Sequence, residues 1–289
     1  MRATGAAMTA IDYETEYNNR ARVPEHPQIF AQWTRDAAAY REQARAEQRA
    51  ELGLTYGAGA RQTIDLLGPA GAPTAPLALF IHGGYWRSLE PSQFSHMAAG
   101  LNAHGVTVAV AGYDLCPQVS VATIVDQLRQ ACLFVWRRLR RPMLVYGHSA
   151  GGHLAAAMLA TDWTALDPAV PAGFIPAAYS VSGLFDLTPL VGVSMNQDLR
   201  LDAAAARRVS PLFWPAPKGR TLDSVVGALE SAEFLRQARI IADAWGKAGV
   251  TTRHEEIAGK NHFTVCDALS DPSSAMVRRL RNLSHAHNS

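Results

Sequence analysis

Short apolar runs alternate with longer amphipathic stretches from about residue 61 onward. Several runs are almost wholly apolar, which is typical of strands that are buried on both faces of a sheet. The predicted strands cover residues 62–67, 77–81, 106–111, 143–146, 177–181, 224–229 and 252–257. Helical patterns lie among them at residues 91–104, 121–139 and 233–247. This alternation predicts an α/β fold, with a mostly parallel central sheet that helices cover on both faces.

The start of the chain has a different pattern. Phe30, Trp33 and Tyr40 recur at helical spacing within residues 27–49, which predicts an amphipathic helix. We expect its aromatic stripe to pack on the core, and a share in covering an active site is the alternative. Residues 1–60 are therefore predicted to form an N-terminal helical extension.

A second departure lies at residues 191–220, where neither the strand nor the helix rhythm continues. This stretch is predicted to be a small cap insertion. The remaining elements form one series without an internal repeat, and α/β folds often exceed 200 residues undivided. We therefore predict a single domain over residues 1–289.

Composition limits the classes of partner. The net charge is +2 and the basic residues form no long runs, so we predict neither a nucleic-acid nor a membrane partner. No apolar run approaches the roughly 18 residues that span a bilayer, and residues 1–10 lack the apolar block of a signal peptide. The three cysteines show no C-x-x-C spacing, so reduced thiols in a cytoplasmic protein are expected. We predict no metal and no cofactor.

A candidate nucleophile follows the predicted strand at residues 143–146. Gly147-His148-Ser149-Ala150-Gly151 has the form G-x-S-x-G, and a helical sequence comes directly after it. Between a strand and a helix, this motif places the serine on a sharp turn above the sheet. The backbone N–H of Ala150, at the helix start, would point towards the reacting carbonyl oxygen. The alternative is a glycine-rich turn with an incidental serine.

A glycine pair follows the predicted strand at residues 77–81, in the sequence His82-Gly83-Gly84-Tyr85-Trp86. Glycines let the backbone turn its N–H groups towards a developing oxyanion. The second oxyanion donor is therefore expected from Gly83, Gly84 or Tyr85, and the sequence does not choose among them. Tyr85 and Trp86 are predicted to line the substrate pocket, with a place in the core as the alternative. His82 is expected to hold the loop by hydrogen bonds.

A serine nucleophile needs a base, and His262 is best placed among ten histidines. It lies just after the last predicted strand, at the carboxyl edge of the sheet where Ser149 is expected. His148 and His153 flank the serine, with their rings directed away from its hydroxyl. We place His148 among the substrate-binding residues.

The acid should follow a strand between the serine and the histidine. Glu230, at the end of the run 225–229, fits this order and would fix the tautomer of His262. The alternative role for Glu230 is a helix-start carboxylate, which Glu233 fits better. Asp223 precedes the predicted strand, and Asp267 follows the histidine.

These residues together resemble the kynurenine formamidase (arylformamidase) group of α/β-hydrolases with an H-G-G-x-W loop. The resemblance covers most of the chain from about residue 77 to residue 269. The motifs that carry it are H-G-G-Y-W at 82–86, Y-D-L-C-P at 113–117, G-H-S-A-G-G-H at 147–153, S-G-L-F-D-L at 182–187, E-S-A-E-F-L-R-Q at 230–237 and N-H-F at 261–263. The family usually has aspartate where this chain has Glu230, and Asp186 matches an aspartate that we interpret as structural.

The resemblance implies hydrolysis of N-formyl-L-kynurenine to kynurenine and formate through an acyl-enzyme. The expected partner is a small aromatic amide or ester. A carboxylesterase, an amidase or a carbamate hydrolase would use the same residues on other small aromatic substrates. A binding protein that keeps the fold without catalysis is the alternative of another class. The sequence determines neither the mobility of the cap nor the oligomeric state, for which a homodimer is one option.

Overall fold

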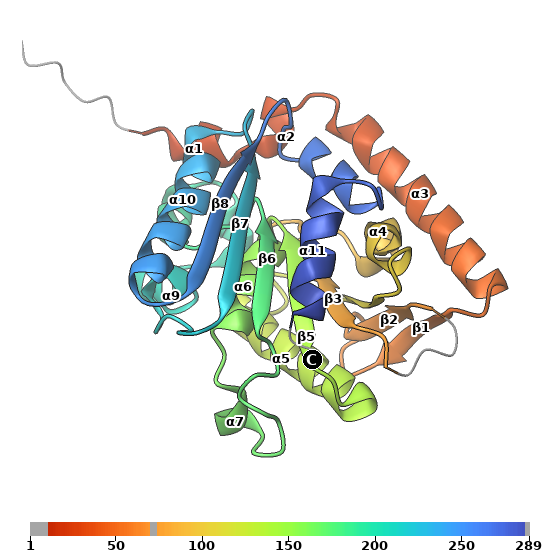
Figure 1. The fold of residues 1–289 in the computed structure, drawn as a ribbon. Coiled ribbons are helices and arrows are strands. Elements are labelled where there is room, and N and C mark those ends of the chain that lie inside the picture. Colours follow the sequence, from red (N-terminus) through yellow and green to blue (C-terminus); the bar gives the residue numbers. More distant parts are fainter. Residues whose placement is uncertain (1–10, 70–73, 287–289) are drawn as a thin grey trace, which may run out of the picture.

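A computed structural model describes residues 11–69 and 74–286. Residues 1–10, on which part of the localisation argument rests, lie outside the described ranges. The strands are β1 (Ala50–Thr55), β2 (Thr63–Leu67), β3 (Leu77–Ile81), β4 (Thr107–Ala111), β5 (Met143–His148), β6 (Ala177–Val181), β7 (Thr221–Gly227) and β8 (Thr251–Ile257). They form one sheet in the order β1-β2-β4-β3-β5-β6-β7-β8, with β1 and β2 at one edge and β8 at the other (Figure 1).

Helices cover both faces of this sheet (Figure 1). The longer helices are α3 (His26–Ala46), α5 (Val121–Leu139), α6 (Ala150–Leu159), α10 (Ala232–Lys247) and α11 (Ala275–His285). The shorter ones are α1 (Tyr13–Tyr17), α2 (Asn19–Arg22), α4 (Ala99–Asn102), α7 (Trp163–Leu166), α8 (Asn196–Leu199) and α9 (Ala203–Arg208). The 3₁₀ turns are η1 (Pro91–Gln93), η2 (Ser95–Ala98), η3 (Thr188–Gly192), η4 (Pro211–Phe213) and η5 (Thr264–Leu269).

Strand β3 shows why its sequence is apolar without alternation. Leu77, Leu79 and Ile81 pack into a core shared with α5, α6 and α10. Ala78 and Phe80 point to the other face, where α3, α4 and α11 close a second core. Successive strand residues face opposite sides, so a strand between two helix layers must be apolar at every position.

Strands β3 to β8 run parallel to one another, whereas β2 pairs antiparallel with both β4 and β1. The predicted α/β class and mostly parallel sheet are therefore confirmed. Because parallel strands end at one edge, the segments after β3, β5, β7 and β8 meet there. This edge receives the glycine loop, Ser149, Glu230 and His262.

Two predicted segments differ from the structure. The extension at residues 1–60 was expected to be helical, but β1 lies within it and pairs with β2. Its exposure alternates along an outer strand and none of its residues is fully buried, so its apolar signal is weak. The predicted helix at 91–104 is broken into η1, η2 and α4 because Phe94, with φ −126°, leaves the helical conformation. Its ring stacks at 5.6 Å on that of His82.

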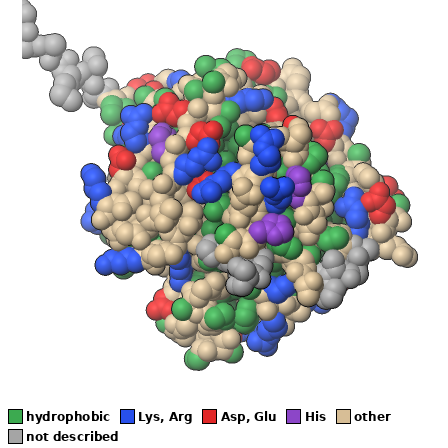
Figure 2. Space-filling model, in the orientation of Figure 1, with side chains coloured by type: hydrophobic (Ala, Val, Ile, Leu, Met, Phe, Trp, Pro, Cys, Tyr) green, Lys and Arg blue, Asp and Glu red, His purple; other side chains and the backbone are tan. Residues whose placement is uncertain are grey.

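Three further predictions concern the surface charge, membrane-spanning helices and the cysteines. Acidic and basic side chains are interspersed on the face shown in Figure 2, in keeping with a net charge of +2. No helix in the described part of the chain is long and apolar enough to span a bilayer. Cys116, Cys132 and Cys266 are buried and form no disulfide.

Candidate active site

Ser149 occupies a strained turn between β5 and α6. Its φ of 56° and ψ of −118° are uncommon for a residue with a side chain. The two flanking positions have no room for a side chain. A Cβ on Gly151 would lie 1.9 Å from the Ile81 carbonyl oxygen. A Cβ on Gly147 would lie 2.4 Å from the carbonyl oxygen of Gly151. The small residues of the motif are therefore needed for the backbone to turn here.

Glu230 and His262 are joined by a buried contact. The Nδ1 atom of His262 lies 2.6 Å from Oε2 of Glu230, and both side chains are almost inaccessible to solvent. The other carboxylate oxygen, Oε1, accepts hydrogen bonds from the Ser182 hydroxyl at 2.5 Å and from the Gly227 N–H at 2.7 Å. A carboxylate that accepts at both oxygens orients the ring beside it and favours the tautomer with the proton on Nδ1.

The other acidic candidates lie elsewhere. Asp223 is inside β7, not before it, and is paired with Arg279. Asp267 reaches Lys260. Glu233 accepts hydrogen bonds from Arg236. None of these three carboxylates contacts His262 in the described residues, which leaves Glu230 as its partner.

His148 packs against the same histidine. The two rings lie 4.7 Å apart, and Nε2 of His148 donates to the His262 carbonyl oxygen at 2.7 Å. Burial, with a smaller contribution from His262, lowers the pKa of His148 well below its usual value, so its ring stays neutral. The ring of Phe234 supports His262 at 4.6 Å.

The glycine loop after β3 passes directly beside the nucleophile. A Cβ on Gly83 would lie 2.9 Å from the His148 carbonyl oxygen and 3.1 Å from Cβ of Ser149. Gly84, Tyr85 and Trp86 all have positive φ, at 111°, 50° and 57°.

The backbone N–H groups of this loop are available to a ligand. Within residues 11–69 and 74–286, those of Gly83, Gly84 and Tyr85 make no hydrogen bond. The fold therefore leaves these N–H groups without a partner among the described residues.

His82 supports this loop from below, as predicted. Its Nδ1 lies 2.7 Å from the Gly83 carbonyl oxygen, and its ring stacks on Tyr113 at 4.3 Å. Burial lowers the pKa of His82 to about 4, so its ring is neutral and is a weak proton acceptor at neutral pH.

A cavity of about 350 Å³ opens above Ser149. Its floor includes Ser149, His148 and His262, and its lining is completed by residues of the N-terminal helices and of residues 191–220. The lining residues are Glu14, Tyr17, Asn18, Asn19, Arg20, Phe30, Trp33, Gly84, Tyr85, Arg87, Ser88, Leu89, His148, Ser149, Ser194, Met195, Asp198, His262 and Phe263. The aromatic stripe of α3 thus packs on the core and also covers the site, since Trp33 contacts both Phe94 and His148.

Trp86 corrects one prediction. It was expected to line the pocket but is fully buried in the core and does not contact the cavity. Its indole N–H points to Nδ1 of His153 at 3.2 Å. The Trp86 side chain therefore lies in the core, whereas Tyr85 lines the cavity.

Sequence reasoning missed three residues of this site. Tyr17 and Asn19 line the cavity from two short N-terminal helices, which carry no periodic apolar signal. Ser182 was noted only within a family motif, and its bond to Glu230 depends on neighbouring strands that are far apart in sequence. Among the described residues, no group of three or more His, Cys, Asp or Glu side chains is placed to hold a metal ion.

Comparison with known proteins identifies the fold family and relatives of this chain. A family model described as the alpha/beta hydrolase fold matches residues 78–265. Kynurenine formamidase of Danio rerio is 30% identical over 247 residues, which cover 83% of each chain. Kynurenine formamidase of Salmo salar is 31% identical over 241 residues, with 80% of each chain covered.

Two solved structures have a similar fold. A protein of Silicibacter sp. TM1040, described as a candidate thioesterase, superposes with a TM-score of 0.83 at 34% identity, covering 93% of this chain and 98% of that one. An esterase of Pyrobaculum calidifontis superposes with a TM-score of 0.70 at 16% identity, covering 93% and 97%, and this likeness concerns the fold alone. The chain belongs to the α/β-hydrolase fold family, within which it is related to the kynurenine formamidases.

Proposed function

We propose that this chain is a serine hydrolase that cleaves a small aryl amide through an acyl-enzyme, with an aryl formamide of the N-formyl-L-kynurenine type as its substrate. One observation carries this proposal. Ser149 and His262 line the same cavity, and the ring of His262 is held from behind by Glu230 at 2.6 Å. This is the arrangement that a nucleophile, its base and an orienting acid require.

The mechanism follows from the roles that these positions allow. His262 takes the proton of Ser149 as the hydroxyl attacks the formyl carbonyl, and Glu230 stabilises the imidazolium. The N–H of Ala150 and a donor from residues 83–85 hold the oxyanion. His262 then protonates the departing aryl amine. Water, activated by the same histidine, cleaves the formyl-enzyme and releases formate.

The cavity supports an aromatic substrate of modest size. Phe30, Trp33, Tyr85 and Phe263 contribute aromatic rings to its lining, and its volume of about 350 Å³ lies at the lower end of small-molecule pockets. An aryl amine is also a better leaving group than an alkyl amine, so the machinery of an esterase suffices for such an amide. The relatedness to kynurenine formamidases favours formamide over other acyl groups.

Ester or thioester cleavage is the second candidate, because the Silicibacter protein at 34% identity is described as a candidate thioesterase. The same nucleophile, base and oxyanion donors serve both reactions. A comparison of kcat/KM for N-formyl-L-kynurenine, p-nitrophenyl acetate and an aryl thioester separates the candidates. We expect the formamide to be the best substrate. A formamide value more than a thousandfold below an ester would overturn the assignment of substrate.

A fluorophosphonate probe tests the catalytic proposal independently of the substrate. We expect the wild type to be labelled and Ser149→Ala to remain unlabelled. An unlabelled wild type with intact circular dichroism would indicate a binding protein that keeps the hydrolase fold.

A further inference from the structure

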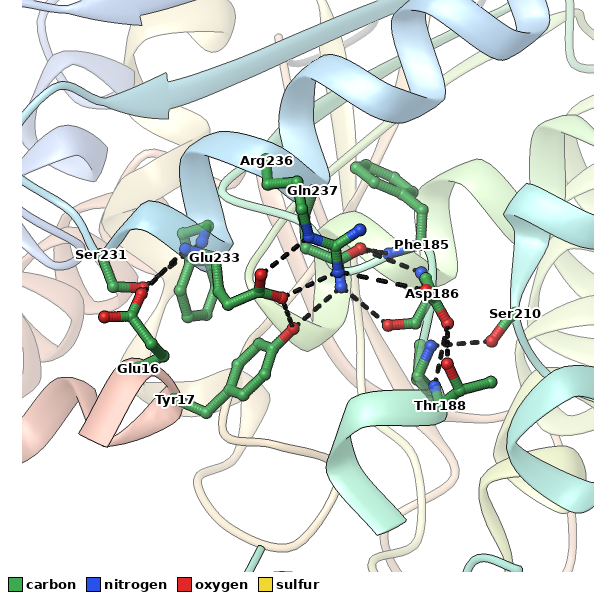
Figure 3. A network of polar contacts seen from close by, with 12 residues as sticks. Glu16, Tyr17, Phe185, Asp186, Thr188, Ser210, Ser231, Glu233, Arg236 and Gln237 are labelled. Carbon is green, nitrogen blue, oxygen red and sulfur yellow. Dashed lines mark hydrogen bonds and ion pairs between the residues drawn. The ribbon is translucent and has the colours of Figure 1, made fainter. Parts of the chain in front are cut away.

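Helix α1 is fastened to helix α10 by a buried phenol and by the Glu16 carboxylate, which accepts from the Glu233 N–H at 2.9 Å (Figure 3). Tyr17, the last residue of α1, is fully buried. Its hydroxyl donates to Oε2 of Glu233 at 2.7 Å and accepts from Nε2 of Gln237 at 3.0 Å (Figure 3). Its ring meets that of Phe234 edge to face at 5.8 Å. Residues more than 200 positions apart in the sequence thus form one buried contact.

The partners of Tyr17 on α10 are themselves fixed. Arg236 donates two hydrogen bonds of 2.8 Å to Glu233 (Figure 3). Burial opposes the charge of Glu233, yet the bonds from Arg236 and Tyr17 hold its pKa below the usual value. Oε1 of Gln237 accepts from the N–H groups of Phe185 and Asp186, in the segment after β6. The anchor for Tyr17 is therefore a satisfied network, and such networks are rigid when fully hydrogen-bonded.

The other end of the same residue reaches the glycine loop. The Tyr85 hydroxyl donates to the Tyr17 carbonyl oxygen at 2.7 Å, and Nδ2 of Asn19 approaches that hydroxyl at 3.3 Å. A tyrosine hydroxyl carries one hydrogen, so Tyr85 has none left to donate to a substrate. Burial raises the pKa of both phenols well above 10, so both stay neutral donors at working pH.

This bond acts on a strained segment. Tyr85 and the following Trp86 have φ of 50° and 57°, which side-chain-bearing residues adopt only when the surroundings enforce it. The backbone N–H of Tyr85 also has no acceptor among the described residues, and the preceding Gly83 lies against Ser149. Holding the hydroxyl of Tyr85 in place therefore fixes the orientation of the loop that presents these donors.

We propose that Tyr17 is a positioning residue for the oxyanion loop. Its phenol fixes helix α1 on the Glu233–Gln237 network of α10, and its carbonyl then fixes Tyr85 and the left-handed turn of residues 84–86. The inference rests on the proposed hydrolase function. It assigns the N-terminal segment a part in the chemical step in addition to its place in the cavity lining.

Tyr17→Phe tests this inference, with Tyr13→Phe as the matched control. Tyr13 lies on the same helix, and its ring packs at 6.2 Å from that of Tyr17, but its hydroxyl makes no hydrogen bond with the described residues. We expect Tyr17→Phe to lower kcat about tenfold with KM changed less than twofold, since a displaced donor weakens transition-state binding selectively. The Ki of a trifluoromethyl ketone should rise by the same factor. The control should keep both constants.

A double-mutant cycle tests the route of the effect. If Tyr17 acts through Tyr85, then Tyr85→Phe should lower kcat at least as much, and the double variant should lose no more than Tyr85→Phe alone. Additive losses, or a Tyr17→Phe enzyme with full kcat, would overturn the inference. Should Tyr17→Phe fail to fold by circular dichroism, full kcat in Tyr85→Phe overturns it instead. Fluorophosphonate labelling of the wild type keeps this outcome distinct from failure of the hydrolase proposal.

Discussion

At the scale of single residues, the Glu230 carboxylate shows how hydrogen bonds hold a buried acid in one orientation. A buried carboxylate is stable only when its oxygens accept hydrogen bonds. Ser182 and the Gly227 N–H hold Oε1, and Oε2 is thereby directed at His262. The Glu230 N–H also donates to the Gly227 carbonyl oxygen at 3.0 Å, which closes the turn that carries the residue.

Glu230→Gln should lower kcat by about 10³–10⁴, as loss of the carboxylate of a catalytic triad does elsewhere. The amide cannot stabilise a charged imidazolium, and it permits the wrong tautomer of His262. Steady-state kinetics on the preferred substrate measures the loss. Asp267→Asn is the control, because Asp267 contacts Lys260 and should leave kcat within twofold. A loss below tenfold in a folded Glu230→Gln enzyme would mean that another residue orients the histidine.

At the scale of elements, the loop after β3 depends on the absence of a side chain at Gly83. The atoms nearest to a Cβ there are the His148 carbonyl oxygen and Cβ of Ser149, neither of which can move aside without shifting the nucleophile turn. We expect Gly83→Ala to push the loop away from Ser149 and to lower kcat about 100-fold, near the cost of losing one oxyanion donor.

The control for this substitution is Gly173→Ala. A Cβ on Gly173 meets no atom within 4 Å, so this variant should keep the wild-type rate. Kinetics and thermal unfolding of both variants separate catalytic displacement from destabilisation. Wild-type kcat in Gly83→Ala would show that the loop does not supply the oxyanion donors.

The elements also show which structure the sequence predicts well. Strands β3 and β6 and helix α5 have the predicted bounds, because each is buried and bears a strong apolar pattern. Strand β7 begins three residues earlier than expected, at Thr221 and not at residue 224. Its polar start, including Asp223, is satisfied by an ion pair with Arg279 that no local pattern reveals.

The residues of the candidate site also fall into those that the sequence predicts and those that it does not. Ser149, His262 and Glu230 follow strands of one sheet edge, so motif and strand order are enough to predict that they converge. The positions of Tyr17 and Trp86 depend on how distant segments pack. Trp86 is buried in the core, where its indole N–H reaches His153, and the Tyr17 phenol is held by Glu233 on α10. Neither contact can be predicted from the residues that neighbour Trp86 or Tyr17 in the sequence.

At the scale of the whole molecule, histidines kept neutral by burial link stability to pH. Burial lowers the pKa of His82 and His153 to about 4, and it also lowers the pKa of His148 well below its usual value. In the unfolded chain these rings titrate near 6.5. Between about pH 6.5 and pH 4, the unfolded state therefore binds more protons than the folded state. The stability gained from neutral rings is full above pH 6.5 and is lost as the pH falls through this window.

Each such histidine should steepen the pH dependence of the free energy of unfolding by up to about 1.4 kcal/mol per pH unit. We expect urea unfolding between pH 7 and pH 5 to show this fall in the wild type. His153→Gln removes one titrating ring beside Trp86 and should reduce the slope by about that amount, whatever its effect on stability at pH 7. His285→Gln, at the exposed end of α11, should leave the slope unchanged. An unchanged slope in His153→Gln would mean that this ring is already protonated or solvated in the folded protein, which its complete burial and its contact with the Val209 carbonyl oxygen argue against.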